Sequence, residues 1–119
     1  MKRQARICNK INCPINNSSI CYRNKIVYKI TCLKCNCFYI GYTKRYIHQR
    51  LKEHLQDSNS SLNKHLDECG NATNNITTSV VYQCNDVIDS QIAESYFIKR
   101  MKPSINSKEE LSKNTHLVV

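Results

Sequence analysis

The sequence predicts an α/β domain in which a small antiparallel β-sheet of about three strands is flanked by helices. Three features predict it: two β-prone runs joined by a short turn, a helix with an apolar residue every fourth position, and a later strand followed by a long helix. With 119 residues and a mass of 13.9 kDa, the chain has room for one such domain.

The two β-prone runs, IVYKIT at 26–31 and CFYIGYT at 37–43, form a hairpin pattern. Side chains alternate between the two faces of a strand, so Tyr28 and Val27 point to opposite faces. The same alternation applies to Tyr39 in the second run. The two tyrosines can therefore share one face of the sheet.

A helix is expected next, from Lys44 to Asp57, with Thr43 as its N-terminal cap. Ile47, Leu51 and Leu55 recur every four residues along it and predict a buried stripe. A parallel row beside this stripe contains Tyr46, Arg50 and His54.

Further elements follow in order along the chain. Residues 60–67 predict a second short helix, residues 77–84 a third strand, and residues 86–102 a helix that ends before Pro103. We therefore divide the chain into a basic arm at 1–24, a folded domain at 25–107 and a polar tail at 108–119.

The charge of the chain favours a polyanionic partner. Lys and Arg number 18 against 9 Asp and Glu, giving a net charge of +9 and a pI near 9.3. No apolar run approaches the length of a membrane-spanning helix, so nucleic acid is the expected partner. The first residues, MKRQARICNK, lack the apolar segment of a signal peptide, which predicts a reducing nuclear or cytoplasmic location.

Four of the chain's potential metal ligands are spaced as in a tetrahedral zinc site. Cys32 and Cys35 are separated by two residues, and His65 and Cys69 by three. A turn would supply the first pair and a helix end the second, which would tie the hairpin to the second helix. The alternative is that these three thiols and one imidazole bind no metal.

The remaining cysteines have weaker spacing. Cys8, Cys13 and Cys21 could form another site with Cys37 or Cys84, or the last two could simply be buried strand residues.

Several landmarks together resemble one family. The strings IVY at 26–28 and YIG at 39–41, followed by Arg50, His54, Glu94 and Asn106, are similar to the landmarks of the GIY-YIG nuclease domain. Singly, each of these residues is more often structural; together, in this order, they favour the nuclease.

Longer strings refine the resemblance. VYKITCLKC, FYIGYTKR, RLKEHL and AESYFIKRMKPSIN are most similar to the endonuclease domains of Penelope-like retroelements, which also carry a Cys pair between the two name-giving motifs. Two positions depart from the pattern: Ile26 replaces the first glycine, and Cys69 stands where a histidine is common.

Hydrolysis of a phosphodiester needs a base for water, positive charge on the phosphate and stabilisation of the leaving oxyanion. Glu94 is the one acidic residue that the sequence places in a suitable setting, which predicts a single Mg²⁺ or Mn²⁺ ion, with Arg50 supplying further charge. A nearby cation lowers a tyrosine pKa, so that Tyr28 or Tyr39 could activate water.

The resemblance assigns the remaining roles. It implies Tyr28 as the general base, Tyr39 as the residue that orients water or phosphate, His54 as an assistant and Asn106 as support, while Gly41 would let the backbone turn closely beside the site.

The predicted function is a metal-dependent DNA endonuclease that nicks a target for retroelement insertion, so that the freed end primes a fused reverse transcriptase. Two alternatives stay open: a free-standing nuclease for branched or damaged DNA, and an inactive zinc-stabilised module that binds nucleic acid.

Overall fold

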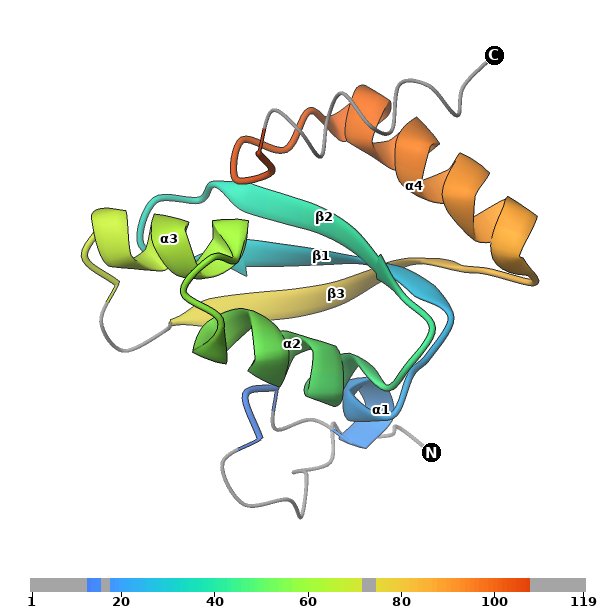
Figure 1. Cartoon of the computed structure of the whole chain (residues 1–119), viewed down its shortest axis with the longest axis horizontal. Coiled ribbons are helices and arrows are strands. Elements are labelled where there is room, and N and C mark those ends of the chain that lie inside the picture. Colours follow the sequence, from blue (N-terminus) through green and yellow to red (C-terminus); the bar gives the residue numbers. More distant parts are fainter. Residues whose placement is uncertain (1–12, 16–17, 72–74, 108–119) are drawn as a thin grey trace, which may run out of the picture.

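A three-stranded antiparallel sheet forms the centre of the protein (Figure 1), as the sequence predicts. The computed structural model describes residues 13–15, 18–71 and 75–107. The strands are β1 (Ile26–Cys32), β2 (Phe38–Thr43) and β3 (Ile76–Gln83). Their order is β2-β1-β3, and β1 pairs antiparallel with both neighbours.

The helices pack on both faces of this sheet. They are α1 (Ser18–Cys21), α2 (Ile47–Gln56), α3 (Ser61–Glu68) and α4 (Val87–Met101). Residues of α2 and α3 pack against one face, and residues of α4 pack against the other. Figure 1 shows α4 next to β2, on the far side of the sheet from α2. None of the helices among the described residues is long and apolar enough to cross a membrane.

The alternation along β1 divides the core in two. Tyr28 and Ile30 join Leu51 of α2 and Leu62 of α3 in the first core, and all four side chains are fully buried. Tyr39 of β2 belongs to the same core. The prediction that the two tyrosines share a face is confirmed.

The second core is smaller and lies under α4. Val27 of β1 and Ile40 of β2 pack there with Ala93 and Ile98. Adjacent residues of one strand therefore serve different cores, because strand side chains point alternately to the two faces.

The start of α2 differs from the prediction. The helix begins at Ile47, and Tyr46 occupies the capping position without a side-chain hydrogen bond. Thr43 remains the last residue of β2, paired with Ile26, and its hydroxyl bonds instead to the backbone of Arg45. Thr43 was wrong as the cap because the ladder with β1 keeps it extended.

The other predicted elements hold to within about one residue. Asp86 caps α4 by accepting a hydrogen bond from the backbone N–H of Asp89 at 2.7 Å. Lys102 ends the helix in the left-handed conformation, with φ of 54°, directly before Pro103. On α2, Ile47 and Leu51 are buried and Leu55 packs beside them, so the stripe is confirmed.

Part of the N-terminal arm packs on the first core. Cys21 is fully buried, and Ile15 and Ile20 contact the core around Tyr28. Residues 1–12 and 108–119, which include Cys8 and the predicted tail, lie outside the described residues.

Candidate active site and candidate zinc site

The two tyrosines lie side by side because a glycine leaves room for them. In the β1–β2 ladder Tyr28 pairs with Gly41, and the rings of Tyr28 and Tyr39 are 6.3 Å apart. A Cβ on Gly41 would lie 2.6 Å from Tyr28 Oη and 2.8 Å from Tyr39 Cε1. Gly41 lies within β2, so its role is space for these rings, and the predicted backbone turn at Gly41 is wrong.

His54 of α2 links Tyr28 to the next helix. Its Nε2 is 2.9 Å from the Tyr28 hydroxyl, and its Nδ1 is 2.7 Å from Ser60 Oγ. The imidazole is buried, and its centre is 5.1 Å from that of the Tyr39 ring. Tyr28, His54 and Ser60 therefore form a continuous chain of hydrogen-bonding groups.

The side chain of Ser60 does not cap the helix that it precedes. It is the N-terminal cap residue of α3, where a serine side chain commonly accepts a hydrogen bond from a backbone N–H of the first turn. No such bond forms here, and the hydroxyl contacts His54 instead. The fold gives up a local cap and gains a fixed orientation of the imidazole.

Arg50 lies one turn before His54 and is half-buried. Burial by itself would lower the pKa of its guanidinium, but Tyr28, Tyr39 and the carboxylate of Glu53 raise that pKa overall. Arg50 Nη1 is 3.3 Å from Glu53 Oε1, and Arg45 forms a second ion pair with the same oxygen. The hydrogen bond from Arg45 holds the pKa of Glu53 below its usual value, so this carboxylate is shared by two cations.

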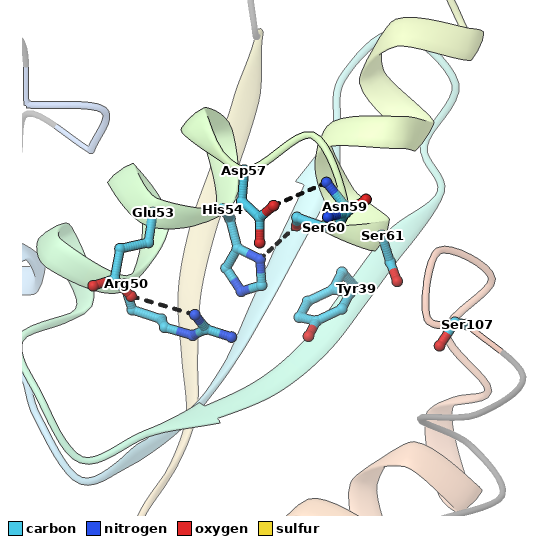
Figure 2. A pocket seen from close by; sticks show the side chains of 9 residues that line it. All are labelled: Tyr39, Arg50, Glu53, His54, Asp57, Asn59, Ser60, Ser61 and Ser107. Carbon is cyan, nitrogen blue, oxygen red and sulfur yellow. Dashed lines mark hydrogen bonds and ion pairs between the residues drawn. The ribbon is translucent and has the colours of Figure 1, made fainter.

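Several of these groups line one pocket (Figure 2), with Tyr39, Arg50 and His54 pointing into it. Tyr28 is not among the lining residues and reaches the pocket through its contact with His54. The residues that line it are Tyr39, Arg50, Glu53, His54, Asp57, Asn59, Ser60, Ser61 and Ser107. Three of them carry chemistry that we did not predict from the sequence: Glu53, Asp57 and Ser60. Helical periodicity could have predicted Glu53 and Asp57, because they follow Arg50 by three and seven residues and therefore lie on the same side of the helix.

Asn106 supports the strand that carries Tyr39. Its buried amide accepts a hydrogen bond from the backbone N–H of Ile40 at 3.0 Å and donates one to the Ile40 carbonyl at 2.8 Å. The side chain thus acts as a strand partner for the edge of β2. Asn106 is not among the residues that line the pocket, whereas the next residue, Ser107, is.

Glu94 lies apart from the other predicted residues. It belongs to α4, the helix over the second core, and it does not line the pocket. Burial raises the pKa of the Cys84 thiol to about 11, and the nearby carboxylates of Asp89 and Glu94 add to this rise. The structure thus brings Tyr28, Tyr39, Arg50 and His54 together, holds Asn106 behind β2, and places Glu94 on the α4 side.

The four predicted zinc ligands do converge. The ligand atoms of Cys32, Cys35, His65 and Cys69 all lie within 4.8 Å of one another. Cys32 Sγ is 3.6 Å from Cys69 Sγ, and Cys35 Sγ is 3.1 Å from His65 Nε2. Three sulfur atoms and one imidazole nitrogen are a donor set that suits Zn²⁺.

One thiol of this cluster is strongly acidified. Burial would raise the pKa of Cys32, but a hydrogen bond from the Asn71 amide, backbone N–H groups and His65 lower it to about 6. Asn71 Nδ2 lies 3.3 Å from Cys32 Sγ. Burial, together with the neighbouring Cys32, raises the pKa of Cys69. The cluster therefore favours one thiolate without a metal, and a cation would favour all three.

The other cysteines divide between the two sides of the sheet. Cys13 Sγ and Cys21 Sγ are 3.4 Å apart. Cys37 packs against the first core, whereas Cys84 is buried in the second. Among the described residues, the four ligands above are the one group of three or more that could hold a metal.

Comparison with known proteins adds one finding. The family model described as the GIY-YIG catalytic domain matches residues 24–109, which is more than half of the chain. No curated protein and no solved structure matched.

Proposed function

The chain belongs to the GIY-YIG catalytic domain family, and we propose that it hydrolyses phosphodiester bonds in DNA as an endonuclease. Membership implies a metal-dependent nuclease with DNA as its substrate. The observation that carries the proposal for this chain is the linked set Tyr28, His54 and Ser60 beside Arg50, which combines a proton path with a cation at one pocket.

The proposed proton path starts at Tyr28. Its hydroxyl proton passes to His54 Nε2, 2.9 Å away, and the phenolate then accepts a proton from the attacking water. Before the transfer, Nδ1 of His54 carries hydrogen and donates it to Ser60 Oγ. The water oxygen then bonds to phosphorus, the P–O bond to the leaving oxygen breaks, and that oxygen takes a proton from solvent. Tyr39 lines the pocket and orients water or phosphate. Because Tyr28 has no exposed surface, Tyr39 is the alternative base.

Arg50 is proposed to bind the phosphate. A guanidinium presents several donors to phosphate oxygens and keeps its charge at every working pH. The ion pair with Glu53 holds Arg50 at the pocket in the absence of DNA. Phosphate would then compete with a carboxylate that Arg45 continues to bind.

We assign one Mg²⁺ or Mn²⁺ ion to Glu94. The carboxylate is partly exposed on α4, and this helix packs on β2, the strand of Tyr39. Carboxylate oxygens are the donors that these ions prefer, and the ion would neutralise phosphate charge and activate water when bound. Asp57, which lines the pocket, is the competing ligand, whereas Glu53 is already engaged by two arginines.

A plasmid-nicking assay tests both the activity and this ligand. We expect cleavage with Mg²⁺ or Mn²⁺ and none in EDTA. Glu94→Gln should abolish cleavage while DNA binding stays close to that of the parent, and the exposed Glu68→Gln serves as the matched control. If Glu94→Gln keeps full activity and Asp57→Asn loses cleavage, Asp57 and not Glu94 is the metal ligand.

We propose that the second constellation holds a structural Zn²⁺ ion. Its ligands would be Cys32, Cys35, His65 and Cys69, and Asn71 would orient the first of them through its hydrogen bond. The cluster ties the end of β1 to the end of α3. Such a link stabilises a small domain without entering the reaction.

The biological setting is proposed from the longer strings. The Cys pair between the two tyrosine motifs supports an endonuclease of the Penelope-like type, comprising a nuclease domain at 25–107 with an arm and a tail. It would act in the nucleus or cytoplasm and nick a target for a fused reverse transcriptase. A reverse-transcriptase reading frame upstream of the domain in its gene would support this setting.

Two other functions remain as outcomes of the same experiments. Absence of that reading frame would favour a free-standing nuclease for branched or damaged DNA. DNA binding without cleavage in any divalent metal would favour an inactive binding module. The presence of the full set Tyr28, Tyr39, Arg50 and His54 at one place argues against the inactive module, because a binding module does not need it.

A further inference from the structure

An aromatic cluster lies at the start of α2, beyond the pocket. It consists of Tyr22, which follows α1, and of Tyr46 and His48 at the beginning of α2. Tyr22 is 45% exposed and Tyr46 41% exposed, whereas His48 is buried. None of the three lines the pocket or belongs to the zinc cluster.

The neighbouring rings hold Tyr46 in place. Its ring stacks on His48 with centroids 5.8 Å apart and planes inclined by 23°. Tyr22 meets the Tyr46 ring edge-on at 5.3 Å and the His48 ring at 5.2 Å. A backbone hydrogen bond of 2.9 Å from Ile47 N to the carbonyl of Arg23 joins the two segments. These contacts restrict the Tyr46 ring, and His48 covers one of its faces, so a ligand would stack on the part that stays exposed and would cost little side-chain entropy.

The position of Tyr46 connects it to the phosphate cation. Tyr46 directly precedes α2, and Arg50 follows four residues later, which is about 6 Å along a helix axis. The backbone N–H of Arg50 bonds to the Tyr46 carbonyl at 3.2 Å. Arg50 and Tyr46 are therefore about one helical turn apart along the backbone.

The distribution of charged residues favours a nucleic acid that runs from the pocket toward the start of α2. Among the described residues up to Lys52, the chain carries eight Lys and Arg and no Asp or Glu. Glu53 follows directly and forms ion pairs with Arg45 and Arg50. Exposed Lys44 and Arg45 immediately precede Tyr46. At the opposite end of α2, Asp57 lines the pocket and repels phosphate. Lys44, together with the ion-paired Arg45, therefore attracts a polyanion in the pocket toward the start of α2.

Resting on the nuclease proposed above, we propose that Tyr46 stacks on an unpaired nucleobase next to the phosphate bound by Arg50. An aromatic side chain reaches the face of a base only where that base has left its stack. The substrate class is therefore DNA with unpaired nucleotides beside the cleavage point, such as a frayed, branched or single-stranded segment.

Binding titrations in EDTA test the proposal independently of cleavage. The probes are a single-stranded oligonucleotide and a blunt duplex of the same sequence. Tyr46→Ala should weaken binding of the single strand about tenfold and leave duplex binding within about twofold, because stacking is lost and phosphate contacts remain. Tyr46→Phe, which keeps the ring, should bind as the parent does.

The matched control is Tyr96→Ala on α4. Tyr96 is 53% exposed, so it is as accessible as Tyr46, but it lies on the helix over the second core. We expect no change in either titration. In addition, fluorescence of a 2-aminopurine base in the single strand should be quenched by the parent and less by Tyr46→Ala.

Two results would overturn the proposal. One is single-strand affinity of a folded Tyr46→Ala variant equal to that of the parent; the other is an equal loss on single strand and duplex. Either result with a parent that still cleaves DNA would reject the stacking surface and keep the nuclease. A parent that binds through Tyr46 and cleaves nothing would reject the nuclease activity and keep the surface.

Discussion

Strand β1 contributes to two constellations that are built in different ways. Near its start, Tyr28 joins side chains that are linked by hydrogen bonds and that border an open pocket. At its end, Cys32 joins three other potential ligands whose atoms all lie within 4.8 Å of one another, so that they could hold a metal ion. We propose that the first arrangement moves protons and binds phosphate and that the second holds a structural metal ion. Changes at one end should therefore alter chemistry, and changes at the other should alter stability.

The largest expected effect is the loss of cleavage in Tyr28→Phe, which should change the start of β1 and leave the zinc cluster at its end intact. The ring and its packing remain, but the group that exchanges a proton with His54 is lost. Single-turnover cleavage should fall by about 10²–10⁴, while zinc content is unchanged. Tyr82→Phe, which loses a hydroxyl bonded to Asp89 on the other side of the sheet, is the matched control and should cleave normally. Cleavage by Tyr28→Phe at the parent rate would move the base to Tyr39 or His54.

The zinc ligands should show the opposite pattern, a loss of stability with little change in the cleavage rate. Cys32→Ser or His65→Ala should reduce bound zinc from about one ion per chain to none and lower the free energy of unfolding by several kcal/mol. The fraction that stays folded should cleave close to the parent rate. Metal analysis and denaturant unfolding measure the two quantities. A zinc-free parent of equal stability would contradict the structural role, and two ions per chain would assign a second site to the N-terminal cysteines.

An intermediate effect is expected from Gly41→Ala. The added methyl would meet the Tyr28 hydroxyl and the Tyr39 ring, both of which are confined in the first core. Displacing them should lower the free energy of unfolding by about 1–3 kcal/mol and reduce cleavage, without loss of zinc. Unfolding curves and metal content test this together. A variant with parental stability and rate would show that the two rings have room to move.

The smallest expected effect concerns Ser60→Ala. Losing its bond to Nδ1 of His54 should slow cleavage by no more than about tenfold, since one hydrogen bond contributes about 0.5–1.5 kcal/mol. The pH profile of the cleavage rate should also change, because the His54 imidazole loses its hydrogen-bond partner. Ser60→Thr keeps the hydroxyl and should restore the parental profile. A loss of stability with an unchanged pH profile would reduce Ser60 to a structural role.

Local sequence patterns were sufficient to predict the helices and strands, the shared face of the two tyrosines and the Cys/His cluster. The stripe of Ile47, Leu51 and Leu55 predicted α2 because burial on a helix repeats with its period. The alternation around Tyr28 predicted which face it shares with Tyr39. The spacing of the cysteines and His65 predicted a cluster because a turn and a helix end leave few other geometries.

The sequence by itself therefore determined the succession of strands and helices along the chain, the common face of the two tyrosines and the makeup of the candidate zinc cluster. Tertiary structure alone decided that Gly41 makes space for two rings, that Ser60 serves His54 in place of its own helix, and that Asn106 completes the edge of β2. It also decided that Asp57 faces the pocket while Glu94 lies on the α4 side. The physical reason is range: period and spacing act between neighbours in the chain, whereas these contacts depend on how separate elements pack against each other.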